Sequence, residues 1–90
     1  MKKEYKIIWD GISIEIVHKP KWAAFYDHIE VRAGQPIPIT ETGYRSIFLT
    51  ETDIAGAGGV IELVKYLLER DADSSDWQQY KEESRQEILF

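Results

Sequence analysis

The sequence predicts an α+β fold in which a three- to four-stranded antiparallel sheet, opening with a hairpin, is followed by two to three C-terminal helices packed on one face. Two observations carry this prediction. The first half alternates apolar and polar residues around an Asp-Gly pair at residues 10–11. From residue 50 on, apolar residues recur at helical spacing. Ninety residues can bury one core, so we expect a single domain over residues 1–90.

The run EYKIIWDGISIEIV, residues 4–17, predicts the hairpin, because Asp-Gly between β-branched runs favours a two-residue turn. Such a turn sets three apolar pairs on one face: Trp9 with Ile12, Ile7 with Ile14, and Tyr5 with Ile16. The opposite face then pairs Lys6 with Glu15 and Ile8 with Ser13. A shift of one residue would destroy this sorting, so the register is predicted together with the turn.

Residues 18–26, HKPKWAAFY, are predicted to connect two strands, because Pro20 cannot donate to a strand ladder. Within this connection we expect Trp22 and Phe25 to seal one edge of the core. Residues 27–33, DHIEVRA, alternate as a strand with two side chains on the apolar face, Ile29 and Val31. Its other face carries His28, Glu30 and Arg32. Residues 46–50, SIFLT, predict a fourth short strand.

Helical signals begin at Thr50, which with Asp53 resembles a capping box and predicts a short turn over residues 51–57. Gly58 and Gly59 are expected to end it. The run VIELVKYLLERD, residues 60–71, predicts a second helix with an apolar stripe: Val60, Ile61, Val64, Leu67 and Leu68. A third helix starts near the candidate caps Ser74, Ser75 and Asp76, and its weaker stripe places it at the margin of the fold: Trp77, Tyr80, Ser84 and Ile88.

The composition excludes several kinds of chemistry and location. The chain has no cysteine, which removes disulfides, iron–sulfur clusters, thiolate metal sites and cysteine nucleophiles, and suits a reducing cytoplasm. No apolar run approaches the roughly 20 residues that span a bilayer. The N-terminal residues MKKEYK lack a secretory signal. We therefore expect a cytoplasmic protein that does not enter a membrane.

The net charge of −5 is unevenly distributed, with a balance of +1 over residues 1–50 and −6 over residues 51–90. An acidic half repels phosphate backbones, which disfavours nucleic-acid binding. The same half could meet a basic partner. In one version, helical acids imitate the phosphates of DNA and inhibit a host defence nuclease: Glu69, Asp71, Asp73, Asp76, Glu82, Glu83 and Glu87. The simpler interpretation is that these acidic residues form the solvent-exposed faces of two helices and bind nothing.

The stretch PIPITETGYRS, residues 36–46, predicts a rigid loop that enters the fourth strand. Its two prolines impose extended backbone, and the residues TET can bond to their own backbone. Gly43 supplies a positive φ. Tyr44 and Arg45 lie where the loop joins the strand.

Two interpretations of this region remain open. In the structural one, Arg45 pairs with Glu41 or Glu30, while Tyr44 covers the sheet edge. In the functional one, eight residues form a single polar surface that binds an anion or a polar peptide, or performs acid–base work. We call these eight residues the predicted patch: His28, Glu30, Arg32, Thr40, Glu41, Tyr44, Arg45 and Ser46.

The motif HIEVRA followed by PIPITETGYRS, then Gly58, Gly59 and a downstream Trp77, resembles a family of small uncharacterised bacterial proteins. The resemblance covers about residues 11–77. It implies an accessory-genome protein, often encoded near plasmid or integrated-element genes, and brings no known activity. Family members often carry a histidine directly after the serine, where this chain has Ile47. That difference weakens any site built on two histidines.

Catalytic and cofactor motifs are weak in this sequence. Only His18 and His28 could start a metal site, and they are far apart, so we assign no metal and no cofactor. The glycine-rich segment AGAGGV lacks the Lys and Ser/Thr of a phosphate loop. Ser46, His28 and Glu30 could form a triad on paper, but no nucleophile elbow accompanies them. We therefore assign no catalytic residue.

The sequence thus favours a small protein that acts by binding another protein through the predicted patch. One alternative is a small hydrolase or nuclease-like enzyme, which needs His28, Glu30 and Arg45 to converge in a concave pocket. Another is the acidic inhibitor described above. Homodimerisation also stays open, because the tail ILF at residues 88–90 and an open sheet edge would need covering.

Overall fold

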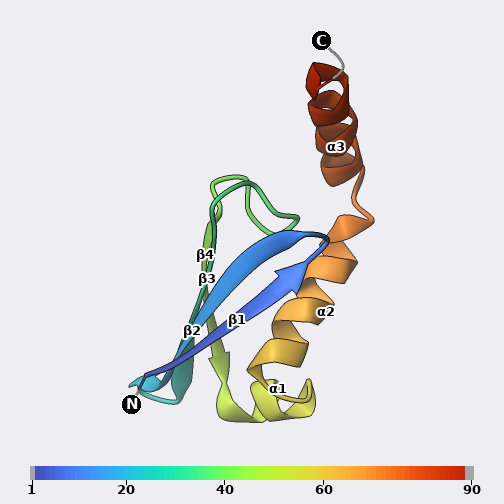
Figure 1. The fold of residues 1–90 in the computed structure, drawn as a ribbon. Helices are drawn as coiled ribbons and strands as arrows, with labels where there is room; N and C mark the ends of the chain where they lie inside the picture. Colours follow the sequence, from blue (N-terminus) through green and yellow to red (C-terminus); the bar gives the residue numbers. More distant parts are fainter. Residues whose placement is uncertain (1, 89–90) are drawn as a thin grey trace.

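The structure, a computed structural model, describes residues 2–88, with side chains described for residues 2–83 (Figure 1). Four strands come first: β1 (Lys3–Trp9), β2 (Ile12–Ala23), β3 (Tyr26–Ala33) and β4 (Tyr44–Thr50). They form one antiparallel sheet in the order β1-β2-β3-β4. Three helices follow: α1 (Glu51–Gly56), α2 (Val60–Ala72) and α3 (Ser75–Ile88). The predicted α+β class is confirmed.

The N-terminal hairpin has the predicted register. Trp9 pairs with Ile12, and the pairing continues two residues at a time to Tyr5 with Ile16. Asp10 and Gly11 both have positive φ, 49° and 76°, as a two-residue turn between right-twisted strands requires. The apolar face of this hairpin therefore points toward the core.

The predicted break at Pro20 is wrong, because β2 continues to Ala23 and β3 starts after a short turn. The β2–β3 register shifts between Lys19 and Ala23, so Pro20 lies in an irregular stretch where no regular ladder bond is needed. Asp27 stabilises this stretch. Its Oδ1 accepts from the Lys21 backbone N–H at 2.9 Å, and its Oδ2 lies 2.8 Å from the His18 Nε2.

Trp22 and Phe25 do not seal the core, which corrects a second expectation. The exposed fraction is 53% for Trp22 and 86% for Phe25. Phe25 lies in the turn between β2 and β3. Trp22 packs instead on the ring of His28, on the face of the sheet away from the core.

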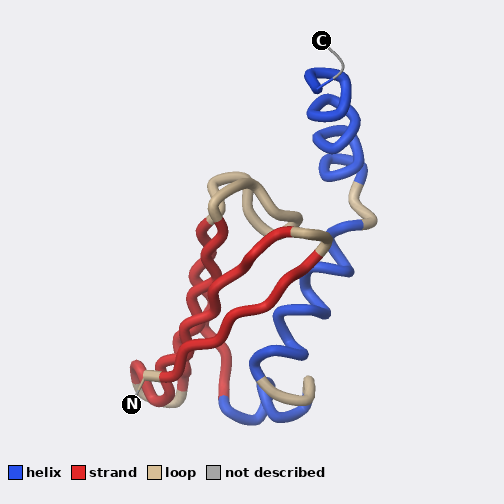
Figure 2. The backbone as a smooth tube through the Cα atoms, viewed as in Figure 1, coloured by secondary structure: helices blue, strands red, loops and turns tan. Residues whose placement is uncertain are grey.

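The core lies between one face of the sheet and the helices α1 and α2, which stand on the same side of it (Figures 1 and 2). Four sheet residues in it are fully buried: Ile14, Ile16, Ile29 and Val31. The buried residues of α2 are Val60, Leu63, Val64 and Leu68. The stripe is thus rotated slightly from the predicted one, since Leu63 is buried while Ile61 and Leu67 are only partly so.

The helix ends follow the predicted caps. Thr50 Oγ1 accepts from the Asp53 backbone N–H at 3.1 Å, and Ser74 Oγ accepts from that of Trp77 at 3.2 Å. Trp77 is buried and lies against Trp9, with 6.2 Å between ring centroids. Beyond this contact α3 extends away from the sheet, so the molecule measures 50 × 20 × 18 Å (Figure 2).

Several sequence-based expectations fall outside the described residues. The side chains of Ser84, Glu87 and Ile88 are not described, and neither are residues 89–90 of the tail ILF. Within residues 2–88, none of the helices has both the length and the apolar character needed to cross a membrane.

Candidate functional site

The predicted patch divides between two separate surfaces. Side chains alternate along β4, so Tyr44 and Ser46 lie on the same face as His28, Glu30 and Arg32. We call this surface, which faces away from α1 and α2, the open face. Arg45 pairs in register with the buried Val31 and therefore belongs to the helix-covered face. Thr40 and Glu41 lie in the loop before β4 and line a groove instead.

His28 is the central side chain of the open face. Its ring lies between Trp22, with centroids 5.2 Å apart, and Phe48, stacked at 4.6 Å with an interplanar angle of 10°. Its Nε2 lies 2.6 Å from Ser46 Oγ. Its Nδ1 is buried and has no hydrogen-bond partner among the described residues. The imidazole is thus held by one hydrogen bond and two aromatic neighbours.

Glu30, next to His28 on this face, is buried and already has three partners. Its Oε2 accepts from Arg32 Nη2 at 2.8 Å, and its Oε1 accepts from Tyr44 Oη at 3.0 Å and lies 3.8 Å from Lys19 Nζ. Burial of the carboxylate raises the pKa of Glu30, but the Tyr44 hydrogen bond and the two cations outweigh it and hold that pKa below its usual value. The same bond raises the pKa of the Tyr44 phenol.

These contacts revise the structural interpretation made from the sequence. Glu30 pairs with Arg32 and Lys19 rather than with Arg45. Within the part of the chain whose side chains are described, neither Arg45 nor Glu41 forms an ion pair. The Tyr44 phenol reaches across the open face from the edge strand β4 to the Glu30 carboxylate on β3.

The loop at residues 34–43 is held in place by its own polar groups and by the core. Thr40 Oγ1 donates to the Tyr44 carbonyl at 2.9 Å, and Ile37 and Thr40 exchange backbone hydrogen bonds. The Gly43 carbonyl accepts from the Ala33 N–H at 2.7 Å. Ile37 and Ile39 are buried, so the loop folds toward the helix-covered side of the sheet.

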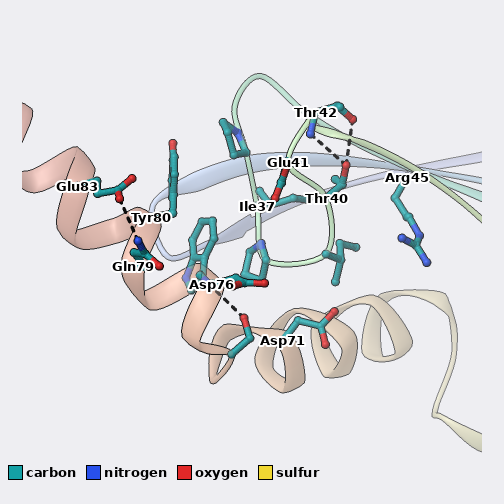
Figure 3. A pocket seen from close by; sticks show the side chains of 15 residues that line it. Ile37, Thr40, Glu41, Thr42, Arg45, Asp71, Asp76, Gln79, Tyr80 and Glu83 are labelled. Carbon is teal, nitrogen blue, oxygen red and sulfur yellow. Dashed lines mark hydrogen bonds between the residues drawn. The ribbon is translucent and has the colours of Figure 1, made fainter.

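The groove lies between this loop, the end of α2 and the start of α3, and has a volume of about 940 Å³ (Figure 3). Proline and aromatic side chains contribute to its walls, together with four carboxylates and one guanidinium. Three of the acids named for the DNA-mimic hypothesis are among them: Asp71, Asp76 and Glu83. Glu41 joins them from the loop, and the guanidinium is that of Arg45.

The open face has an aromatic character that the sequence pattern did not predict. Trp22, Tyr26, Tyr44 and Phe48 are all about half exposed there. For Phe48 the signal was present, since it stands two residues after Ser46 on the same strand and must share its face. For Trp22 no local signal existed, because the register shift in β2 decides its side of the sheet.

The positions of His28, Ser46, Glu30 and Arg45 do not form the arrangement that the catalytic alternative requires. His28 and Ser46 are in contact, but the Glu30 carboxylate binds Tyr44, Arg32 and Lys19, and it forms no hydrogen bond to the imidazole. The convergence of His28, Glu30 and Arg45 that the enzyme alternative requires is therefore not met, since Arg45 lies on the opposite face. Among the described residues, no group of three or more His, Asp or Glu side chains is arranged to hold a metal ion.

Comparison with known proteins identifies a family. The family model described as the KlcB third domain matches residues 2–77, which include the whole sheet, α1, α2 and the first residues of α3. Comparison with curated proteins and with solved structures gives no significant match.

Proposed function

We propose that this chain, which belongs to the KlcB third-domain family, is a protein-binding domain that uses the open face of its sheet. The family description implies that in KlcB the same unit occurs beside other domains. The resemblance noted in the sequence supports an origin in the bacterial accessory genome.

One observation carries the proposal: large apolar side chains are concentrated on a sheet face that none of the described helices covers. Four aromatic residues and Ile8 are each 46–68% exposed there, with the aromatic residues being Trp22, Tyr26, Tyr44 and Phe48. Trp, Tyr and Arg are the residue types that most often dominate binding energy at protein interfaces. Arg32, which is half exposed and lies over the Tyr44 ring at 5.9 Å, adds the third type.

The charges on the open face favour a protein partner over a nucleic acid. The regular strand positions of this face in β1, β2 and β3 carry three acids and three bases: Glu4, Lys6, Glu15, Lys19, Glu30 and Arg32. A surface with balanced charge offers no net attraction to a phosphate backbone, which is the main source of nucleic-acid affinity. Balanced charges around an apolar centre are instead typical of a protein interface.

Site-specific photo-crosslinking tests the proposal. A photoreactive phenylalanine analogue replaces Phe48 on the open face or, as a matched control, Tyr66, an aromatic residue of α2 that is 60% exposed. Each protein is irradiated in a bacterial lysate, with unlabelled wild type or Trp22→Ser added as competitor. We expect a discrete protein adduct at Phe48, absent at Tyr66, that wild type suppresses and Trp22→Ser suppresses poorly.

Three results would contradict the proposal. An adduct that forms equally at Tyr66 would show non-specific capture, and equal competition by Trp22→Ser would show that the open face is not the contact. The third is saturable binding of a fluorescent single-stranded oligonucleotide that Trp22→Ser abolishes, because aromatic groups on a sheet can also stack bases. An adduct of twice the chain mass would identify the partner as a second copy of this chain. That result would support the proposal, because the partner would still be a protein.

A further inference from the structure

The groove between the loop and α3 lies on the other side of the sheet and is built from four segments: the loop, the start of β4, the end of α2 and the start of α3. Pro36 and Pro38 come from the loop and Trp77 from α3. Asp71, from the last turn of α2, and Tyr80, from α3, are labelled in Figure 3. A volume of about 940 Å³ is within the range of sites that hold peptides and small ligands. Its shape depends on Trp77, which anchors α3 against Trp9.

The aromatic part of the groove can accept a planar cation. Trp77 and Tyr80 are stacked, with centroids 5.3 Å apart and an interplanar angle of 28°. Tyr80 is only partly buried, so part of its ring is accessible. A guanidinium or ammonium group placed over such a ring is attracted by the negative face of its π system.

Carboxylates from the loop, from α2 and from α3 line the same groove as this aromatic pair. Among the residues whose side chains are described, the lining contains Glu41, Asp71, Asp76 and Glu83 and one cation, Arg45, a net charge of −3. Asp71 is paired with Arg70 Nε at 3.0 Å, and Glu83 accepts from Gln79 Nε2 at 3.2 Å. Glu41 and Asp76 have no side-chain hydrogen bond or ion pair within the described part of the chain. Two of the four carboxylates are thus available to a ligand.

We propose that this groove binds an arginine-containing segment of a partner protein, with a guanidinium against the accessible part of Tyr80, which the buried Trp77 holds in place, and paired with Glu41 or Asp76. Charge complementarity and the aromatic pair point to this occupant together. Arginine fits better than lysine, because a planar guanidinium both stacks on an aromatic face and binds a carboxylate through two parallel hydrogen bonds. The groove is a second binding surface, separate from the open face.

The inference is tested by nuclear magnetic resonance titration of the ¹⁵N-labelled protein with an acetylated tri-arginine amide. The readouts are the Trp77 indole N–H and the backbone amides of Glu41 and Asp76. Acetylated tri-lysine and tri-glutamate amides serve as comparison ligands. The variant Glu41→Gln/Asp76→Asn removes two groove carboxylates, while Glu62→Gln/Glu69→Gln removes two exposed carboxylates of α2 outside the groove, so both have the same net charge.

We expect saturable shifts at the groove with tri-arginine, weaker ones with tri-lysine, and none with tri-glutamate. Because exposed ion pairs contribute modestly, the groove variant should raise the Kd about fivefold or more, and the control variant less than about twofold. Melting curves of both variants check that they stay folded. Neither substitution touches the open face, so loss of tri-arginine binding is distinguishable from loss of the crosslinked partner.

The inference is overturned if tri-arginine gives no saturable shift at millimolar concentration. It is also overturned if the α2 control variant loses as much affinity as the groove variant, because overall charge would then explain the binding. Equal affinity for tri-lysine would reject the assignment to arginine.

Discussion

The imidazole of His28 and the hydroxyl of Ser46 meet across β3 and β4, with 2.6 Å between Nε2 and Oγ. This is the only hydrogen bond of the imidazole among the described residues, since Nδ1 is buried without a partner. The ring is otherwise held by stacking on Phe48 and by Trp22. His28 is therefore placed by packing as much as by polar contacts.

Ser46→Ala should lower the free energy of unfolding by about 1–2 kcal/mol, because it leaves a buried imidazole with neither nitrogen bonded. Urea denaturation at neutral pH measures the change. Ser13→Ala is the matched control, since Ser13 is an exposed serine on the same face, in β2. An equal loss in both variants would mean that the His28–Ser46 bond contributes nothing specific.

Glu30→Gln should destabilise the protein more at neutral pH than in acid. Partners hold the pKa of Glu30 below its usual value, so the charged carboxylate stabilises the fold above the unfolded-state pKa. That contribution is lost as the pH falls through the lower folded-state pKa. The difference in unfolding free energy between wild type and variant should therefore be largest near pH 7 and shrink toward about pH 3.

Urea denaturation at several pH values gives this difference directly. Burial raises the pKa of Asp27, but hydrogen bonds from the Lys21 N–H and His18 outweigh it and lower that pKa as well. Because Asp27 is present in both proteins, its contribution to the pH dependence of stability cancels when they are compared. Glu15→Gln serves as a control, because Glu15 is exposed on the same face. A Glu30→Gln effect that is constant from pH 7 to about pH 3 would contradict the electrostatic account of Glu30.

The N-terminal hairpin could be predicted to the register because local information decides it. The Asp10–Gly11 turn and the alternation of apolar residues both select the same pairing. Pro20 shows where this reasoning ends. The irregular stretch that accommodates it has positive φ at Lys21 and is held by Asp27, which lies on the next strand. Such a contact cannot be read from the local pattern.

The division of the predicted patch has a similar explanation. The fourth strand was expected to begin at Ser46, but it begins at Tyr44, so the alternation that separates Arg45 from its neighbours was not applied to it. Thr40 and Glu41 are carried to the groove because Ile37 and Ile39 insert into the core. The predicted patch grouped these residues by their place in the chain, whereas the fold sorts them by face.

Gly43→Ala should be strongly destabilising. Gly43 has φ +81°, and an added Cβ would lie 2.5 Å from the Ala33 carbonyl oxygen and 3.1 Å from that of Gln35. Both atoms belong to the backbone and cannot move aside cheaply. We expect a loss of about 2 kcal/mol or more, seen as a fall in Tm of roughly 10 °C. Gly34→Ala, where nothing lies within 4 Å of an added Cβ, should change Tm little.

Trp77→Ala should release α3 while leaving the sheet folded. Trp77 is the buried residue through which α3 packs on Trp9, and removing a buried tryptophan costs about 3–5 kcal/mol. Beyond Trp77, α3 projects from the sheet (Figure 1), and its described side chains add the partly buried Tyr80 and an exposed ion pair between Lys81 and Asp10 at 3.5 Å. Hydrogen exchange should therefore accelerate in residues 75–83 far more than in β2 and β3, and the groove should lose its affinity for tri-arginine.

Tyr66→Ala is the control for this prediction, because Tyr66 is an exposed aromatic residue of α2 that does not line the groove. It should leave exchange in α3 unchanged. If Trp77→Ala instead accelerated exchange equally in all elements, α3 would be part of one cooperative unit with the sheet. The groove would then be a fixed feature of the fold, and binding at it would not depend on the docking of a separate helix.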